Sequence, residues 1–286
     1  MAVKGGLVDI HQQAQKAEWF RQLHHGPHIL VLVNVWDVAS ARLVEEAGFP
    51  AVATSSGAVA NSYGYPDGQR ISRAEMLGAV ERIARNVKLP VTADLESGYG
   101  DSADAVTELA STMVAAGAVG LNFEDGTGDP ANPLLPLEQH VAKIQRLRAA
   151  TNATGVPVVI NARTDVYLAQ VGEPATRFEH ALRRANAYRQ AGGDCLFVPG
   201  VSDAETIGKL VKAVGGPLNI LAAPGCPSVG ELERLGVARL SFGSWPFRSV
   251  MGWFDKLLKQ VREPESLAEV TAATIPYKGL NALFKP

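Results

Sequence analysis

The sequence is poor in cysteine and has no long hydrophobic run. Its 286 residues include two cysteines, Cys195 and Cys226, each in an apolar, strand-like context. A disulfide scaffold is therefore not expected, and the chain reads as an intracellular, cytoplasmic protein. The N-terminus lacks the apolar segment of a signal peptide. No run approaches the roughly 20 apolar residues that a membrane span needs, so no membrane partner is expected.

The sequence also has little net charge. Its 27 basic and 29 acidic residues leave a formal charge of −2. This balance gives no electrostatic reason to expect a nucleic acid or an anionic membrane surface as a partner. The composition is that of a globular protein, 47% hydrophobic and 20% charged. One α/β barrel domain of about 200–250 residues can account for most of this length.

One pattern recurs about eight times: a short apolar run ends in polar residues and is followed by a helical segment. The runs predicted to be strands are residues 29–35, 51–55, 91–96, 120–125, 158–163, 195–198, 219–223 and 238–242. The predicted helices are residues 38–46, a segment that begins near Ser72, and residues 101–116, 137–150, 177–191, 203–214, 230–235 and 247–261. Near-continuous apolar strands that alternate with helices favour a closed (β/α)8 TIM-type barrel with helices outside. A doubly wound open sheet is the structural alternative.

Some segments lie outside this repeat. The amphipathic residues 11–23 are expected to cover the floor of the barrel, and the tail after Glu263 looks irregular and is expected to pack on a neighbouring subunit. No linker divides the sequence, so residues 1–286 are predicted to form a single barrel domain. Two long connections, residues 56–71 and 126–136, follow the carboxyl ends of strands, where barrel enzymes hold their active sites. Loops of this length usually carry function or act as lids.

Acidic residues gather at the ends of two neighbouring predicted strands. Asp94 and Glu96 end the third strand, and Glu124 ends the fourth. Since the two acids of the third strand are two residues apart, both are expected on the same side. Three close carboxylates repel unless a cation lies between them. Mg²⁺ prefers oxygen ligands and fits this role, and no His/Cys cluster suggests zinc. The alternative is that these acids are solvated strand ends or helix caps.

Other polar side chains are expected on the same face. Arg163 ends the fifth strand, where its planar guanidinium could hold a substrate carboxylate or stabilise an oxyanion. The alternative is a structural pair with Asp165 or Glu124. The segment Ser55-Ser56-Gly57 offers hydroxyls and N–H groups to a second anionic end of the substrate, unless it is an ordinary polar turn.

Asp67 stands in the segment Tyr65-Pro66-Asp67-Gly68, which by itself is plain turn chemistry. It enters the list of candidate site residues only through the resemblance described next.

Four motifs occur in order along most of the chain, from about residue 33 to residue 247. They are Asn34-Val35-Trp36-Asp37-Val38-Ala39-Ser40-Ala41-Arg42, Asp94-Leu95-Glu96-Ser97-Gly98-Tyr99-Gly100, Asn122-Phe123-Glu124-Asp125 and Asn161-Ala162-Arg163-Thr164-Asp165. With them the chain resembles the isocitrate lyase/phosphoenolpyruvate mutase superfamily, in particular its phosphonomutase-like branch. The resemblance implies a Mg²⁺-binding barrel, commonly a homotetramer (or a dimer) whose last helix is exchanged between subunits. It also implies small 2-oxo acids, or relatives that pass through a metal-bound enolate, as substrates.

The resemblance also implies roles for individual residues. Asp94 would be the direct ligand of Mg²⁺, or of Mn²⁺ in its place, while Glu96 and Glu124 would hold metal-bound waters. Ser55 would hold the substrate carboxylate, Arg163 would stabilise the reacting oxyanion, and Asp67 would lie near the reacting group. The candidate set is therefore Arg163, Asp67 and Glu124 as catalytic residues; Ser55, Ser56, Gly57, Trp36, Asn161 and Arg163 as substrate-binding residues; and Asp94, Glu96 and Glu124 as the metal site.

At some positions the sequence differs from the motifs of the family's lyases and mutases, and these differences reduce the number of expected reactions. Isocitrate and methylisocitrate lyases carry a Lys-Lys-Cys-Gly-His-like signature on a mobile loop, but residues 126–133 here contain no Cys, Lys or His. Loss of that acid–base group, worth roughly 10²–10⁴ in rate, argues against cleavage of those substrates. Phosphonate mutases carry an Asn and basic residues on this loop and a His after the sixth strand. Here Asn132 is available, but the sixth strand ends in Val198-Pro199.

The expected function is therefore that of a Mg²⁺-dependent lyase or hydrolase. It would act on a C–C bond next to the carbonyl of a small 2-oxo acid, for example by decarboxylation or hydrolytic cleavage of an oxaloacetate-like diacid. A phosphonopyruvate or phosphoenolpyruvate mutase or hydrolase is one alternative. The other is a 2-oxo acid binding protein that has lost turnover.

Overall fold

Nine short parallel strands form the centre of the protein in the computed structural model, which describes residues 9–262 and 274–284. The strands are β1 (Leu30–Leu32), β2 (Asn34–Val35), β3 (Val52–Thr54), β4 (Val91–Asp94), β5 (Gly120–Glu124), β6 (Val159–Arg163), β7 (Cys195–Phe197), β8 (Leu218–Leu221) and β9 (Arg239–Ser241). β1 and β2 are two halves of one predicted strand, interrupted at Val33. Because β1 pairs with β9 and β2 pairs with β3, the sheet closes on itself.

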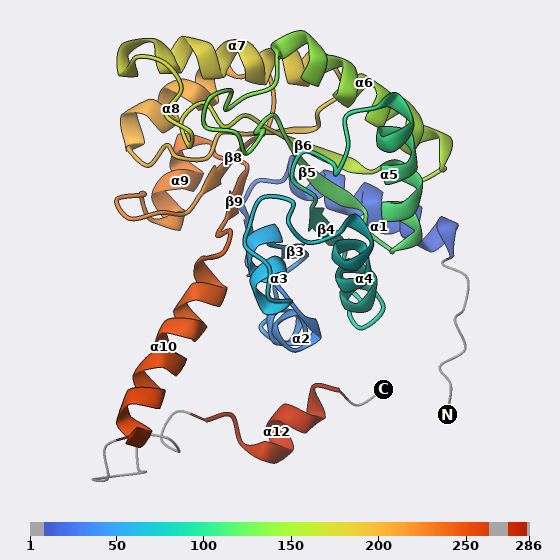
Figure 1. Ribbon diagram of the computed structural model, residues 1–286, viewed down its shortest axis with the longest axis vertical. Helices are drawn as coiled ribbons and strands as arrows, with labels where there is room; N and C mark the ends of the chain where they lie inside the picture. Colours follow the sequence, from blue (N-terminus) through green and yellow to red (C-terminus); the bar gives the residue numbers. More distant parts are fainter. Residues whose placement is uncertain (1–8, 263–273, 285–286) are drawn as a thin grey trace.

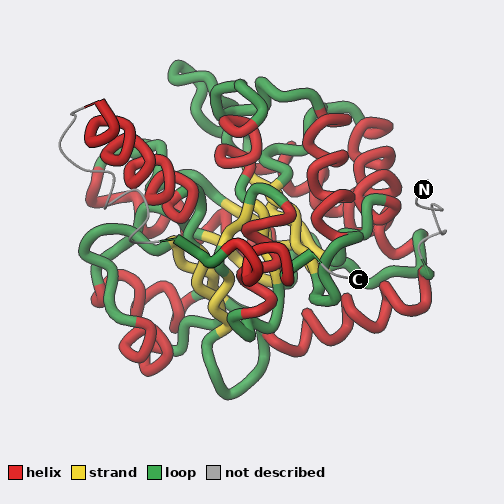
Figure 2. Tube along the Cα trace, turned by 90° about the horizontal axis from the view of Figure 1, so that it is seen from below, coloured by secondary structure: helices red, strands yellow, loops and turns green. Residues whose placement is uncertain are grey.

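Helices surround this closed sheet, as Figure 2 shows with the yellow strands at the centre. They are α1 (Ile10–Leu23), α2 (Val38–Glu46), α3 (Ser56–Ser62), α4 (Arg73–Ala84), α5 (Ala103–Ala115), α6 (Leu137–Ala153), the 3₁₀ turn η1 (Pro174–Thr176), α7 (Arg177–Gln190), α8 (Ala204–Ala213), α9 (Val229–Leu235), α10 (Trp245–Arg262) and α12 (Tyr277–Ala282). The predicted TIM-type barrel is confirmed, and the open-sheet alternative is wrong (Figure 1).

Local sequence explains where several helices begin. Ser72 and Glu75 form the predicted capping box of α4, in which the side-chain oxygen of each residue accepts a hydrogen bond from the backbone N–H of the other. Asp37 caps α2 in the same reciprocal way with Ser40. Each cap satisfies backbone N–H groups that have no partner inside the helix, so the chain turns sharply from strand to helix.

Helix α1 covers the floor of the barrel, as expected. Phe20 is fully buried, and a Cβ on Gly120, the first residue of β5, would lie 2.8 Å from its ring. The amide of Gln13 donates hydrogen bonds of 2.9 Å to the carbonyl oxygens of Val114 and Ala118. These contacts seal the amino ends of the strands and leave the carboxyl ends open to solvent.

Two helices lie where the sequence predicts irregular chain. α3 occupies the start of the long 56–71 connection and begins where the Ser55 hydroxyl accepts a 3.4 Å hydrogen bond from the Ala58 N–H. α12 lies in the C-terminal tail, whose residues 263–273 are outside the described part of the chain. Both helices are short, so they offer too few turns for a clear hydrophobic period in the sequence.

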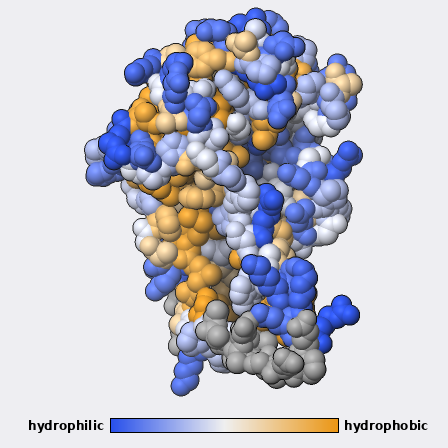
Figure 3. Space-filling view, turned by 90° about the vertical axis from the view of Figure 1, so that its left-hand side faces the viewer, coloured by the Kyte–Doolittle hydropathy of each residue, from blue (hydrophilic) through white to orange (hydrophobic). Residues whose placement is uncertain are grey.

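Helix α10 leaves the barrel and projects away from it (Figure 1). Phe247 is buried, but most other apolar side chains of α10 are not covered by the rest of the described chain, and Figure 3 shows a hydrophobic strip along this part of the molecule. The uncovered side chains are Trp245, Val250, Met251, Trp253, Phe254, Leu258 and Val261, which are 37–51% exposed. Among the helices in the described ranges, none combines the length and apolar character needed to cross a membrane.

Candidate active site

The carboxyl ends of the strands surround two adjoining hollows that share Leu168. The inner chamber, about 170 Å³, is lined by Asn34, Ser55, Ser56, Gly57, Asp67, Asp94, Asn122, Arg163, Leu168, Phe197, Leu221, Ser241, Gly243 and Ser244. The outer vestibule, about 420 Å³, is lined by Gly68, Gln69, Glu96, Glu124, Gly126, Thr127, Gly128, Asp129, Pro130, Pro133, Asp165, Leu168 and Ala169. Barrel enzymes carry their sites at this end.

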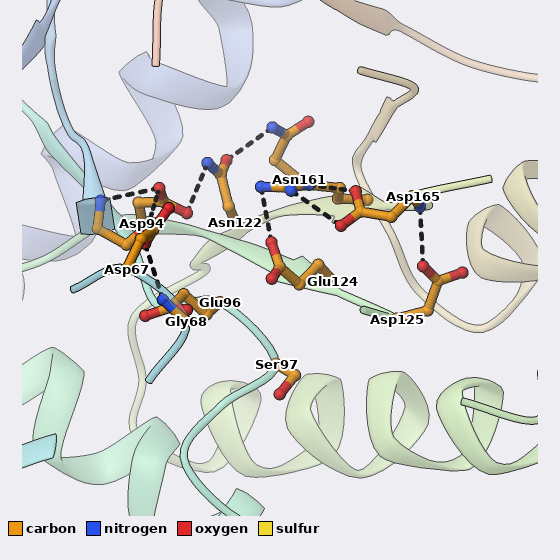
Figure 4. Close-up of polar contacts among 12 residues, drawn as sticks. Asp67, Gly68, Asp94, Glu96, Ser97, Asn122, Glu124, Asp125, Asn161 and Asp165 are labelled. Atoms are coloured by element: carbon orange, nitrogen blue, oxygen red, sulfur yellow. Dashed lines mark hydrogen bonds and ion pairs between the residues drawn. The ribbon is translucent and has the colours of Figure 1, made fainter. Parts of the chain in front are cut away.

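Asp94 ends β4 and points into the inner chamber (Figure 4). Its Oδ2 accepts hydrogen bonds from the backbone N–H and the hydroxyl of Ser56, at 2.9 and 2.8 Å. Its Oδ1 accepts a 3.1 Å hydrogen bond from the amide of Asn122. All three donors are neutral, so they fix the orientation of the Asp94 carboxylate but supply no positive charge to pair with it.

Glu96 does not share a strand with Asp94, so the expectation that both acids face one side of the same strand is wrong. β4 ends at Asp94, and Glu96 lies in the left-handed region with φ +51°. Tyr99, also left-handed at φ +58°, donates a 3.1 Å hydrogen bond from its hydroxyl to Oε1 of Glu96. Such non-glycine conformations each cost of order 1 kcal/mol or more and often accompany functional loops. The tight turn carries Glu96 to the outer vestibule.

The charge state of Glu96 reflects its neighbours. Burial, reinforced by the negative charges of Asp94 and Asp67, raises the pKa of Glu96 to about 7. Burial and the nearby Asp94 also raise the pKa of Asp67. The site therefore concentrates negative charge at the rim, and a cation placed there would be strongly favoured.

Arg163 lies between two acids. Its Nη1 is 2.6 Å from Oε2 of Glu124, while its Nε and Nη2 donate hydrogen bonds of 2.6 and 2.9 Å to the two oxygens of Asp165. Burial raises the pKa of Glu124 well above its ordinary value, and Arg163 works against that rise. The structural pairing considered as an alternative is thus present, and Arg163 at the same time lines the inner chamber.

Asp67 is part of the inner chamber and not merely a turn residue. A Cβ on Gly57 would lie 2.9 Å from Cγ and Oδ2 of Asp67. Only glycine therefore lets α3 approach this carboxyl so closely. The sequence motif Ser55-Ser56-Gly57 is the start of α3, and its third residue makes room for the acid.

Three candidate substrate-binding residues have different surroundings. Trp36 packs edge-on against Phe247, with ring centroids 5.2 Å apart, and lines a separate pocket near α2 and α4. Asn161 is fully buried and donates a 2.7 Å hydrogen bond to Oδ1 of Asn122, so it supports the chamber from below. Ser55 does line the chamber, as expected.

The sequence analysis missed several lining residues. Asn34 accepts hydrogen bonds of 2.8 and 2.9 Å from the N–H groups of Phe242 and Gly243, and so joins the last strand to the first. The signal for most of them is their position at or near the carboxyl end of a strand, whereas Asn122 lies at the middle of β5. Asn34 and Asn122 stand in the family motifs but were given no role in the site, and the lining residues that no motif pointed to include Phe197, Leu221, Ser241 and Ser244.

The three predicted metal ligands are divided between the two hollows. Within the described residues, no three His, Cys, Asp or Glu side chains group closely enough to hold a metal ion by themselves. Asp94 lines the inner chamber, whereas Glu96 and Glu124 line the vestibule. The three remain electrostatically coupled, because Asp94 and Glu96 both raise the pKa of Glu124. The donor atoms are oxygens throughout, which suits Mg²⁺ or Mn²⁺ better than a soft metal.

Comparisons with known proteins agree with this architecture. The phosphoenolpyruvate phosphomutase family matches residues 20–262. A Burkholderia cenocepacia J2315 structure described as a lyase/mutase is 36% identical, covers 96% of this chain and 98% of its own, and has a TM-score of 0.90. The oxaloacetate decarboxylase of Bradyrhizobium diazoefficiens is 30% identical over 274 residues, 91% of each chain.

A third relative is a phosphonopyruvate hydrolase whose structure contains oxalate and Mg²⁺. It is 26% identical, covers 94% of each chain, and has a TM-score of 0.82. The names of these relatives include a decarboxylase and a hydrolase, and others are a 2-methylisocitrate lyase and a phosphoenolpyruvate phosphomutase. The chain belongs to the phosphoenolpyruvate mutase/isocitrate lyase superfamily of enzymes, which includes lyases, mutases and hydrolases.

Proposed function

We propose that this protein is a Mg²⁺-dependent lyase or hydrolase that cleaves a C–C bond next to the carbonyl of a small 2-oxo acid. An oxaloacetate-like diacid is the substrate that we favour. The observation that carries the proposal is that Asp94 and Arg163 both line one chamber of about 170 Å³. Pockets for drug-sized ligands are usually about 300–1,000 Å³, so this chamber suits a smaller molecule.

The residues fit Mg²⁺. Asp94 offers a carboxylate whose side-chain oxygens accept hydrogen bonds from neutral donors, and Glu96 and Glu124 have raised pKa values that a nearby cation would lower. Asp94 would hold the ion directly, and the other two acids would accept hydrogen bonds from its waters. When bound, the ion would act as a Lewis acid that polarises the keto group and withdraws electrons from the scissile bond. Mn²⁺ could take its place, since the donors are all oxygen.

The chain's own residues have separable roles in this proposal. Arg163, held by Glu124 and Asp165, would stabilise negative charge that develops on the substrate oxygen. Ser55 and the backbone around Gly57 would hold the substrate carboxylate. Asp67, which has a raised pKa and lines the same chamber, would be placed to give or take a proton. The 126–136 loop would limit the access of water.

The relatives support C–C chemistry and leave room for another branch. An oxaloacetate decarboxylase matches over nine tenths of the chain, and the phosphonopyruvate hydrolase relative binds oxalate together with Mg²⁺. A phosphonate group needs more positive charge than Arg163 supplies, and Arg163 is the one cationic side chain among the described residues that line either hollow. That observation favours a carboxylic acid over a phosphonate.

The proposal is tested by a panel of 2-oxo acids, phosphonopyruvate, phosphoenolpyruvate and 2-methylisocitrate, each with and without Mg²⁺. We expect oxaloacetate or a close analogue to turn over only with the metal, and Asp94→Ala to abolish that turnover. The matched control is Asp104→Ala, an acid in the first turn of α5 on the exposed surface. Turnover of a phosphonate alone would move the protein to the mutase branch. Tight binding of 2-oxo acids without any product would make it a binding protein.

We also propose that the protein works in the cytoplasm as an oligomer, a tetramer or a dimer, in which α10 is exchanged between subunits. The apolar strip of α10 supports this, because exposed apolar surface of this extent usually marks an interface. The free thiols of Cys195 and Cys226 support the location. Light scattering should give a mass above that of one chain, and Phe254→Asp should lower it. A wild-type monomer at all concentrations would exclude the exchange.

A further inference from the structure

Strand β5 has two faces with different tasks. Asn122 and Glu124 point into the barrel toward the chamber and the vestibule. Because side chains alternate along a strand, Phe123 points outward toward the helices. Asp125 directly follows the strand and points the same way, since its carboxylate contacts Arg184 and Tyr188 on α7. Asp125 is completely buried there, although it is charged. A buried charge needs partners, and those partners explain its role.

The carboxylate of Asp125 collects four hydrogen bonds. Its Oδ2 accepts from the hydroxyls of Thr164 and Tyr188, at 2.8 and 2.6 Å, and from Nη1 of Arg184 at 3.0 Å. Its Oδ1 accepts a 2.9 Å hydrogen bond from the backbone N–H of Asp165 (Figure 4). Asp125 thus fixes the backbone of the residue that holds Arg163.

Arg184 on α7 also binds the root of the loop that covers the vestibule. Its Nη1 and Nη2 both donate 3.0 Å hydrogen bonds to the carbonyl oxygen of Leu135. The N–H of Leu135 donates in turn to the carbonyl oxygen of Asp125, at 2.8 Å. Leu135 ends the loop of residues 126–135, whose base is closed by the antiparallel bridge between Gly126 and Leu134. One buried guanidinium therefore holds both Asp125 and the end of this loop.

Aromatic packing keeps this unit away from water. His140 stacks on Phe123 and meets the ring of Tyr188 edge-on, with centroid distances of 5.2 and 4.7 Å. Burial lowers the pKa of His140 to about 3, so this ring is neutral and does not compete with Arg184 for Asp125. In such surroundings the charged hydrogen bonds of Arg184 are stronger and better defined than at a surface.

We propose that Arg184 and Asp125 form a positioning unit that couples the 126–135 loop to the orientation of Arg163. Through Arg184 the loop root at Leu135 and the Asp165 backbone share one rigid support. A displacement at either end is transmitted to the other. Neither residue touches the chamber or the vestibule, so neither is a catalytic residue. The kinetic part of this inference rests on the proposed function, whereas the coupling itself does not.

A second buried cation provides a matched comparison. Lys143 on α6 donates hydrogen bonds of 2.9 Å to the carbonyl oxygen of Ser97 and 3.0 Å to Asp101. It therefore holds the turn that follows Glu96 and makes no hydrogen bond to the 126–135 loop, although its ammonium also lies 5.4 Å from the ring centroid of Phe123. If each cation stabilises only the segment that it contacts, loss of Arg184 should increase the motion of the 126–135 loop, and loss of Lys143 should increase the motion of the turn after Glu96.

Hydrogen exchange tests the coupling without any substrate. In Arg184→Lys, which keeps the charge but loses the planar fork, we expect amides of residues 126–136 and of Asp165 to exchange about tenfold faster. In Lys143→Met the faster exchange should be confined to residues 97–101. Unchanged exchange at 126–136 in Arg184→Lys, or the same pattern in both variants, would overturn the proposal. Tyr188→Phe, which removes one donor to Asp125, provides a milder variant of the same unit.

Kinetics test the consequence for Arg163. Arg184→Lys should lower kcat by about tenfold and Arg184→Met by about 10²-fold, with KM changed less, because a misplaced catalytic group loses transition-state stabilisation. Arg183→Met is the control, since this neighbouring arginine on α7 is exposed. If both Arg184 variants keep wild-type kcat, the coupling to Arg163 is wrong. If the wild type turns over none of the acids, the proposed function fails, and the exchange experiment still decides the coupling.

Discussion

The two ends of the barrel use the same kinds of charged residue in opposite ways. At the floor, Asp194 pairs with Arg21 and with Arg148, and it accepts a 2.7 Å hydrogen bond from the N–H of Ile160. At the rim, burial and mutual repulsion raise the pKa values of Asp67, Glu96 and Glu124. The floor acid is compensated by two arginines. At the rim Arg163 pairs with Glu124, whereas Asp67 and Glu96 form no salt bridge within the described residues and are left to be compensated by a bound cation.

This difference indicates that the charged residues at the floor stabilise the fold, whereas those at the rim are arranged to bind a ligand. In TIM barrels the amino-terminal face serves stability and the carboxyl-terminal face serves catalysis. A carboxylate surrounded by cations contributes to folding, and crowded carboxylates cost stability until a ligand arrives. Substitutions at the two ends should therefore separate loss of stability from loss of activity.

The largest effect is expected at the floor. Asp194→Ala leaves two partly buried guanidinium groups without their acid, so the free energy of unfolding should fall by about 3–5 kcal/mol. Denaturant unfolding measures this change, and protein that remains folded should keep its activity per active site. Glu18→Ala removes only the exposed acid 3.7 Å from Arg21 and serves as the control, with a change below about 1 kcal/mol. Equal losses in the two variants would contradict the role assigned to Asp194.

The opposite outcome is expected at Arg163. Arg163→Lys cannot hold Glu124 and Asp165 together while facing the chamber, so kcat should fall by about 10²–10³-fold. The melting temperature should change by only a few degrees, because Lys keeps the positive charge. Steady-state kinetics and thermal melting of the same preparations separate the two quantities. A large loss of stability with normal kcat would show that Arg163, like the charged residues at the floor, stabilises the fold and does not act in catalysis.

A smaller effect is expected from steric change in the inner chamber. A methyl group at Gly57 would meet the Asp67 carboxyl at 2.9 Å, so Gly57→Ala should displace that group and lower kcat by about tenfold. Gly78→Ala is the matched control, because Gly78 lies in α4 with nothing within 4 Å of an added Cβ. That control should raise stability by up to about 1 kcal/mol without affecting activity. Full activity of Gly57→Ala would mean that the position of Asp67 does not matter.

The smallest effect concerns pH. The pKa of Glu96 is about 7 in the folded protein against 4.5 for an ordinary Glu, so the folded state holds this proton more tightly than the unfolded state. Stability of the metal-free protein should therefore be greatest below about pH 4.5, as far as Glu96 is concerned, and should fall as the pH rises toward 7. Glu96→Gln should reduce this slope, and added Mg²⁺ should reduce it in the wild type. Melting curves at several pH values measure both changes, and identical slopes in wild type and variant would refute the assignment.

The sequence predicted the barrel well because hydrophobic periodicity and helix caps act over short distances. The predicted helix 38–46 coincides with α2, and the Ser72–Glu75 capping box is present. The apolar runs became strands that are buried on both faces, as a parallel sheet requires. Helix α3 was missed because it is short and depends on one hydroxyl cap within a long connection.

The site was predicted less completely. Acidic strand ends pointed correctly to one face, but the strand was expected to continue to Glu96, which the left-handed turn prevents. Trp36 was expected at the substrate and instead packs on Phe247. Ser241 was not chosen because an isolated polar residue in an apolar strand has no distinguishing pattern in the sequence. Asn34 stands in the first family motif, but nothing in that motif distinguishes its role from that of its neighbours.

By itself, the sequence determined the alternation of strands and helices, the acidic motifs at the strand ends and the superfamily to which the chain belongs. These are properties of neighbouring residues, and short-range chemistry fixes them. Only the tertiary structure decided which charges are compensated, since that depends on residues far apart in the chain. Asp194 and Glu96 look alike as isolated acids, but closure of the barrel places Asp194 between two arginines and Glu96 near the carboxylates of Asp94 and Asp67.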